Sequence, residues 1–157
     1  MIAVLLAALA AGAIAQGETR YRFELGGEPI GTAELRVSCA GERCAVRWSV
    51  RTRAPEAAGG AIHARRVELE SDTEGSWVGG PLEIFEDGEP VGAKGKWGAV
   101  PISLAEVVMA RARTDEPPCV EVFDERSGEA GKACARRGDG ATWELDVRGE
   151  RERVRMG

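Results

Sequence analysis

Few residues of this chain could do chemistry, and its four cysteines are the most informative of them. They fall into two pairs, Cys39 with Cys44 and Cys119 with Cys134, each on either side of a turn sequence. If each pair occupies opposed positions on antiparallel strands, the Cβ atoms come within the ~3.8 Å that a disulfide needs. A metal site with Cys-x4-Cys spacing is the alternative, but no further cysteine or histidine lies near it. We therefore predict two cross-strand disulfides, with four free thiols as the remaining alternative.

His63 is the only histidine, so any serine or cysteine nucleophile would depend on it. It lies near the start of a predicted strand and shares the parity of Val67 and Leu69, which favours a structural role. The sequence has no nucleophile-elbow, metalloprotease, dinucleotide or calcium-loop motif, and residues 92–97 depart from a phosphate loop. These observations predict a protein that is not an enzyme and that needs no cofactor or metal.

A cluster of carboxylates occurs in a predicted hairpin. Its members are Glu83, Glu86, Asp87 and Glu89. Two carboxylates about 5 to 10 Å apart are the acid and base of a glycosidase, so this cluster is a candidate catalytic pair. Such enzymes usually line their cleft with aromatic residues, of which the whole chain has only eight. A solvated acidic hairpin is therefore the better interpretation.

The first fifteen residues form an apolar run that ends in Ala13-Ile14-Ala15. A short apolar segment closed by a small-x-small site is typical of a secretory signal peptide, and it is too short to span a bilayer, which takes ~20 residues. A buried apolar N-terminal helix is the alternative. We expect residues 1–15 to be a signal peptide and residues 16–157 to be one exported β-rich domain. A periplasmic location follows, with no transmembrane segment in the mature chain.

The net charge is −5, and no basic stripe with interleaved aromatic residues occurs, which argues against a nucleic-acid partner. Arginines nevertheless recur on the predicted outer face of the first three strands. They are Arg20, Arg22, Arg36, Arg47, Arg51 and Arg53. They could bind an anionic partner such as a lipid headgroup, although a solvated strand face is the favoured interpretation.

Residues 20–53 alternate between apolar and polar types so regularly that they predict three consecutive antiparallel strands. A turn is expected over residues 26–31. Placing Cys39 opposite Cys44 sets the register of the second and third strands, and every apolar residue then falls on one face. That register opposes Val37 with Val46, Leu35 with Trp48, and Ala33 with Val50.

Gly-Glu-Pro-x-Gly occurs twice, at residues 27–31 and 88–92, each time after an apolar strand. Two related hairpins would explain the repeat, but we favour a simpler cause, which is that this sequence makes a good hairpin turn. Further strands are expected at residues 61–71, 77–86, 91–97 and 142–148, with a poorer candidate at 150–156, and the pairing of Cys119 with Cys134 predicts another hairpin with its turn over residues 125–131.

One helix is expected over residues 103–113, because Ser103 and Glu106 form a capping box and two prolines follow. The fold class is therefore mainly β, an antiparallel meander that forms a curved sheet or half-barrel with one short helix. Its inner face would carry aromatic residues that either fill a core or line an apolar cavity. The candidate ligand-facing residues are Tyr21, Phe23, Trp48 and Trp143.

The aromatic first strand, the turn at residues 27–31 and the following Thr32-Ala33-Glu34-Leu35 resemble a bacterial family of unknown function grouped with the lipoprotein-carrier half-barrels. Similar domains precede exported transglutaminase-like domains, whose Cys-His-Asp core would lie beyond Gly157. The resemblance implies a non-catalytic exported β domain that binds a hydrophobic or lipid-like ligand or an envelope partner. The alternative is a structural or accessory N-terminal module of a larger exported protein, in which case the chain continues beyond Gly157.

Overall fold

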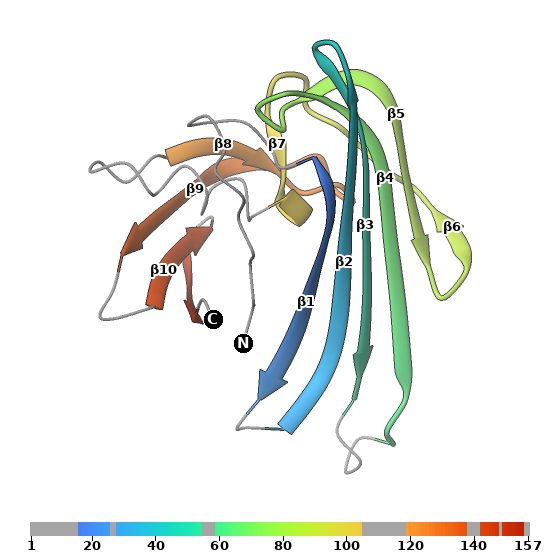
Figure 1. Cartoon of the computed structure of the whole chain (residues 1–157), viewed down its shortest axis with the longest axis vertical. Helices are drawn as coiled ribbons and strands as arrows, with labels where there is room; N and C mark the ends of the chain where they lie inside the picture. Colours follow the sequence, from blue (N-terminus) through green and yellow to red (C-terminus); the bar gives the residue numbers. More distant parts are fainter. Residues whose placement is uncertain are drawn as a thin grey trace.

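The computed structural model describes residues 16–25, 28–54, 59–104, 119–137, 142–147 and 149–155. These residues form two β-sheets and almost no helix (Figure 1). The predicted signal peptide at residues 1–15 lies outside the described residues. Among those that are described, no helix is long and apolar enough to cross a membrane.

The first sheet is an antiparallel meander of six strands in chain order. Its strands are β1 (Gly17–Leu25), β2 (Glu28–Ala40), β3 (Arg43–Arg53), β4 (Ile62–Asp72), β5 (Trp77–Glu86) and β6 (Glu89–Val91). The predicted register is confirmed, since Cys39 lies opposite Cys44 and Leu35 lies opposite Trp48. The sheet is strongly curved and does not close into a barrel (Figure 1). The predicted mainly-β, curved-sheet fold is therefore confirmed.

The second sheet has five strands in the order β11-β10-β9-β8-β7. Their bounds are β7 (Val100–Pro101), β8 (Cys119–Phe123), β9 (Ala130–Arg137), β10 (Thr142–Val147) and β11 (Glu150–Arg155). The pairs β8–β9, β9–β10 and β10–β11 are antiparallel, whereas the short β7 runs parallel to β8. Because β7 follows the first sheet along the chain, this parallel pair ties the two sheets together.

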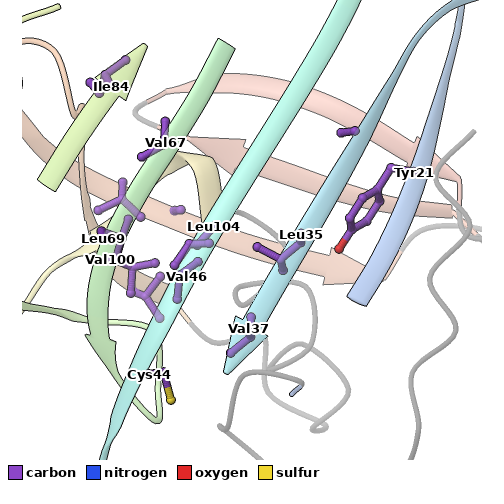
Figure 2. Packing of buried hydrophobic residues seen from close by; sticks show 14 of the residues in the cluster. Tyr21, Leu35, Val37, Cys44, Val46, Val67, Leu69, Ile84, Val100 and Leu104 are labelled. Atoms are coloured by element: carbon purple, nitrogen blue, oxygen red, sulfur yellow. The ribbon is translucent and has the colours of Figure 1, made fainter. Parts of the chain in front are cut away.

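The hydrophobic core lies between the two sheets. The first sheet contributes inward residues such as Leu35 and Val67, and the second sheet contributes Val122 and Ala135. Figure 2 shows Val100 and Leu104, from the segment that joins the sheets, among the inner side chains of β3 and β4. Each fully buried aliphatic side chain of this kind stabilises the fold by about 1.5 to 3 kcal/mol. The alternation that predicts the strands thus also defines the buried face.

The two Gly-Glu-Pro-x-Gly sequences begin hairpins with the same register. Leu25 pairs with Glu28 in the first, and Glu86 pairs with Glu89 in the second. The turn predicted over residues 26–31 is therefore shorter than expected, because β2 already begins at Glu28. The first hairpin also has a bulge between Phe23 and Glu24, which leaves Ile30 without a partner in the register.

The strand predicted at residues 91–97 is wrong, because β6 ends at Val91 and residues 92–96 have no regular structure. This segment crosses β5 instead of extending a strand. Gly95 lies against the ring of Trp77, where any Cβ atom would overlap it. The Trp77 N–H donates to the Ala99 carbonyl oxygen at 2.9 Å, and the Gly98 N–H donates to the Trp77 carbonyl oxygen at 2.9 Å. Glycines thus make a close crossing possible where alternation predicts a strand.

The predicted helix falls mostly outside the described residues. A 3-10 turn, η2, occupies Ile102–Leu104, and the remainder of the expected helix, residues 105–113, lies outside the described residues. The candidate strand at residues 150–156, which is a poor strand by sequence, pairs with β10 as β11.

Candidate ligand-binding face

Both predicted disulfides are confirmed. Cys39 pairs with Cys44 at the end of the β2–β3 hairpin, with Cα atoms 3.9 Å apart, and Cys119 pairs with Cys134 across β8 and β9, with Cα atoms 4.2 Å apart. The sulfur of Cys44 belongs to the buried core, whereas Cys119 is exposed. Disulfides persist in oxidising compartments, so the two bonds indicate an extracytoplasmic environment.

The predicted aromatic residues of β1 and β3 meet on the inner face of the first sheet. The rings of Tyr21 and Trp48 contact edge to face, with centroids 5.2 Å apart. Their strands are separated by β2, whose residue opposite Tyr21 is the small Ala33. A methyl group at that position leaves room for the tyrosine ring to reach across the intervening strand. Edge-to-face pairs of this kind add about 0.5 to 1.5 kcal/mol beyond the area that they bury.

The hydroxyl group of Tyr21 is a buried donor with no acceptor among the described residues. The residue is 5% exposed, and its hydroxyl oxygen has no hydrogen-bond partner among the described residues. Figure 2 shows this oxygen pointing away from β1, on the side of Leu35 and Val37. A buried tyrosine hydroxyl usually finds a partner, and leaving it without one costs about 1 to 3 kcal/mol. The inner face thus holds an unused polar group in apolar surroundings.

Two further inner-face residues extend this apolar surface. Phe23 and Val50 are half-buried and pack against the core cluster, as Trp48 does. Trp143 lies on β10, opposite Arg137 and Val154, and its side chain is outside the described residues. The structure therefore brings three of the four predicted ligand-facing residues to one face and places the fourth by its backbone only.

His63 lies at the rim of the inner face, opposite Thr52 of β3. It is exposed, and its Nδ1 is 3.5 Å from Oδ2 of Asp87, in the turn between β5 and β6. The Ala64 N–H donates to Oδ1 of Asp87 at 2.9 Å. This backbone hydrogen bond, with a smaller contribution from His63, lowers the pKa of Asp87. These contacts hold the β5–β6 turn against β4, which is a structural role for His63.

The predicted acidic cluster is divided between the two faces of the sheet, since Glu86 and Glu89 lie opposite each other on β5 and β6 whereas Glu83 lies apart from them. Glu83 lies opposite Glu68 on the outer face of the sheet. Glu86 lies 3.5 Å from Nη1 of Arg126, and Asp87 is held by Ala64 and His63. No group of histidine, cysteine or acidic side chains able to hold a metal occurs in the described part of the chain. Glu86 and Asp87 each contact a basic side chain, and Glu83 is separated from them on the outer face.

Glu125 has no signal in the sequence, yet it is the most buried acidic residue of the described chain, 1% exposed. It lies in the turn after β8, where its Oε1 accepts a hydrogen bond of 2.8 Å from the Ser103 N–H. Its Oε2 is 3.7 Å from Nη2 of Arg65 on β4, and its carbonyl oxygen accepts from the Lys94 N–H. One carboxylate thus joins both sheets and the segment between them.

The outer face of the first sheet carries a shallow groove of about 660 Å³ that crosses five strands. Charged residues of both signs line it, among them Glu18, Arg36, Arg47, Glu68 and Glu83, with Ala45 and Pro81. Most of these charges neutralise one another. Arg47 lies 2.8 Å from Glu68, and Arg36 lies 3.4 Å from Glu18.

The six arginines predicted on the outer face therefore divide into two groups. Arg20, Arg36 and Arg47 each have a glutamate within ion-pair distance. Arg22, Arg51 and Arg53 have none among the described residues.

Neither a protein-family model, nor a characterised protein, nor a solved structure is significantly similar to the chain.

Proposed function

We propose that this protein is a non-catalytic exported β domain that binds a hydrophobic or lipid-like ligand on the inner face of its six-stranded sheet. The observation that carries the proposal is the Tyr21 hydroxyl, a buried donor beside the ring of Trp48 that has no partner in the described part of the chain. Ligand sites combine mostly apolar walls with a few polar groups that orient the ligand. Here the alkyl part would lie on the aromatic residues, and a carboxylate or ester oxygen would accept from Tyr21.

The surroundings of Tyr21 support an apolar ligand in particular. Phe23, Trp48 and Val50 are only half-buried, and they pack against the cluster of buried core residues. Covering such apolar surface is favourable by about 25 cal/mol per Å². The disulfides and the predicted signal peptide support export, and a periplasm is the compartment we propose. If the inner face only fills a core, the protein is instead a structural or accessory module.

Binding can be measured with a dansyl-labelled undecanoic acid, whose emission rises in an apolar site. We expect saturable binding by the wild-type protein and weaker binding by Tyr21→Phe and Trp48→Ala. Loss of one aromatic contact worth about 1.5 to 3 kcal/mol corresponds to an affinity loss of at least about tenfold. Trp97→Ala is the matched control, because Trp97 is 74% exposed and belongs to the segment after β6.

Tyr21→Phe keeps the ring and removes only the hydroxyl, so it tests the orienting role without emptying the face. Circular dichroism of each variant shows whether its fold is retained. Absence of saturable binding by the wild-type protein would overturn the proposal and favour the structural module. Equal weakening by Trp48→Ala and Trp97→Ala would show that the probe binds elsewhere.

A further inference from the structure

Arg22, Arg51 and Arg53, which form no ion pair with the described residues, form one patch on the outer face, which we call the arginine patch. Arg22 on β1 and Arg51 on β3 both pair in register with Thr32 of β2. Two strand spacings put these arginines roughly 10 Å apart, and Arg51 and Arg53 are about 7 Å apart along β3. All three are exposed. Three like charges are thus gathered with no carboxylate of the described chain to balance them.

The rest of the same face shows that this imbalance is local. One register position further along the outer face, Arg20 lies opposite Glu34, and both Arg20 and Arg36 approach that carboxylate. Beyond it, Arg47 is paired with Glu68. Like charges gathered on one face of a sheet repel one another unless a counter-charge lies near them. The patch therefore suits an anionic partner, whereas the paired arginines do not.

An exposed aliphatic side chain adjoins the patch. Ile62 begins β4 directly opposite Arg53 and is 52% exposed. Ile62 and Trp97 are the large hydrophobic residues that the described chain exposes. Figure 1 places the β3–β4 end of the sheet at the tip farthest from β7 and β8. A cationic patch with an adjacent aliphatic group at a protruding tip has the chemistry of an anionic membrane surface, with phosphates outside and apolar chains beneath.

We propose that the arginine patch docks this domain on an anionic lipid surface, with the three guanidinium groups on headgroup phosphates and Ile62 at the apolar boundary. Guanidinium groups bind phosphate oxygens through paired N–H donors, which suits this contact. The proposal concerns the outer face, so it does not depend on the ligand that we propose for the inner face.

Vesicle flotation tests the proposal. Vesicles of equal parts phosphatidylglycerol and phosphatidylcholine are compared with vesicles of phosphatidylcholine alone. We expect the wild-type protein to bind only the anionic vesicles, and less at high salt. A basic residue near an anionic surface contributes ~1 kcal/mol, so Arg51→Ala and Arg53→Ala should each weaken binding about fivefold.

Arg36→Ala is the matched control, because it removes the same charge from the same face but at a paired position. It should leave vesicle binding nearly unchanged. Equal weakening by Arg36→Ala and Arg51→Ala would overturn the proposal, since it would show a response to net charge alone. Equal binding to both kinds of vesicle would also overturn it.

A second comparison separates a membrane surface from a free phosphate. Ile62→Ser should weaken binding to the anionic vesicles, and glycerol phosphate alone should bind too weakly to detect by calorimetry. Tight binding of glycerol phosphate that Ile62→Ser leaves unchanged would identify a small-anion site and overturn the membrane proposal. All these positions are exposed, so the substitutions should leave the fold intact.

Discussion

The final glycines of the two Gly-Glu-Pro-x-Gly sequences provide a matched test of the packing. Gly31 lies within β2, between Phe23 of β1 and Thr52 of β3. A Cβ atom at Gly31 would overlap the carbonyl oxygen of Arg51 and lie 3.1 Å from the Cα of Thr52. A Cβ atom at Gly92, which follows the edge strand β6, would meet nothing within 4 Å. The same residue in the same sequence motif should therefore respond differently to substitution by alanine.

The difference can be estimated. The obstacle at Gly31 is backbone, which yields less readily than the end of a flexible side chain, and overpacking costs about 1 to 3 kcal/mol. Replacing glycine by alanine also lowers the conformational entropy of the unfolded chain. This stabilises the folded state by about 0.4 to 1 kcal/mol where the backbone conformation is compatible. We expect Gly31→Ala to lose up to about 2 kcal/mol of unfolding free energy. Gly92→Ala should be neutral or slightly stabilising.

Thermal unfolding followed by circular dichroism measures both variants. At roughly 4 °C per kcal/mol for a chain of this size, Gly31→Ala should lower the midpoint by up to about 8 °C. Gly92→Ala should shift it by no more than about 4 °C, toward higher temperature. Equal midpoints for the two variants would contradict the packing of β2 between β1 and β3. A larger loss for Gly92→Ala would show that residue 92 is in closer contact than the structure indicates.

Two further predictions concern the groups that connect the sheets and turns. Glu125→Ala should lower the free energy of unfolding in urea by about 2 to 3 kcal/mol, because the Ser103 N–H loses its acceptor. Glu125→Gln keeps an acceptor oxygen and should lower it clearly less. Equal losses for the two variants would assign the effect to packing. The folded pKa of Asp87 lies below its ordinary value, so its contribution to stability is present above pH ~4 and is lost as pH falls through the folded value. His63→Ala should raise that pKa only part of the way, since the Ala64 N–H remains, and a carboxyl-carbon NMR titration that shows no change would contradict the contact.

The sequence predicts the first sheet well because two independent constraints agree. Alternation fixes which residues face inward but not which strand positions are opposed, since a slip of two residues preserves the faces. The cysteine pair removes that freedom, because Cys39 and Cys44 can form a disulfide only in the observed register. Both constraints act between neighbours along the chain, which is why they can be recognised without knowledge of the tertiary structure.

The second sheet and its connection to the first depend on contacts between distant segments. Strand β7 has two residues and pairs in parallel with β8, so it shows no alternation to recognise. The burial of Glu125 depends on Ser103 and Arg65 arriving from other segments, and an isolated glutamate in a turn sequence predicts only exposure. The crossing at residues 92–96 depends on Gly95 fitting the ring of Trp77. Each of these features depends on a contact with a distant segment, and periodicity in the sequence does not identify that segment.

The outer-face arginines show the same limit in a form that bears on function. Alternation correctly places all six on one face, and on that basis a solvated face is favoured but a basic stripe remains open. What separates them is the register, since the glutamates that neutralise three of the arginines come from β1, β2 and β4. The patch that remains is defined by the absence of such partners around Arg22, Arg51 and Arg53 within the described chain. A binding surface that is defined by arginines without nearby glutamates can be identified only after the pairing of the strands is known.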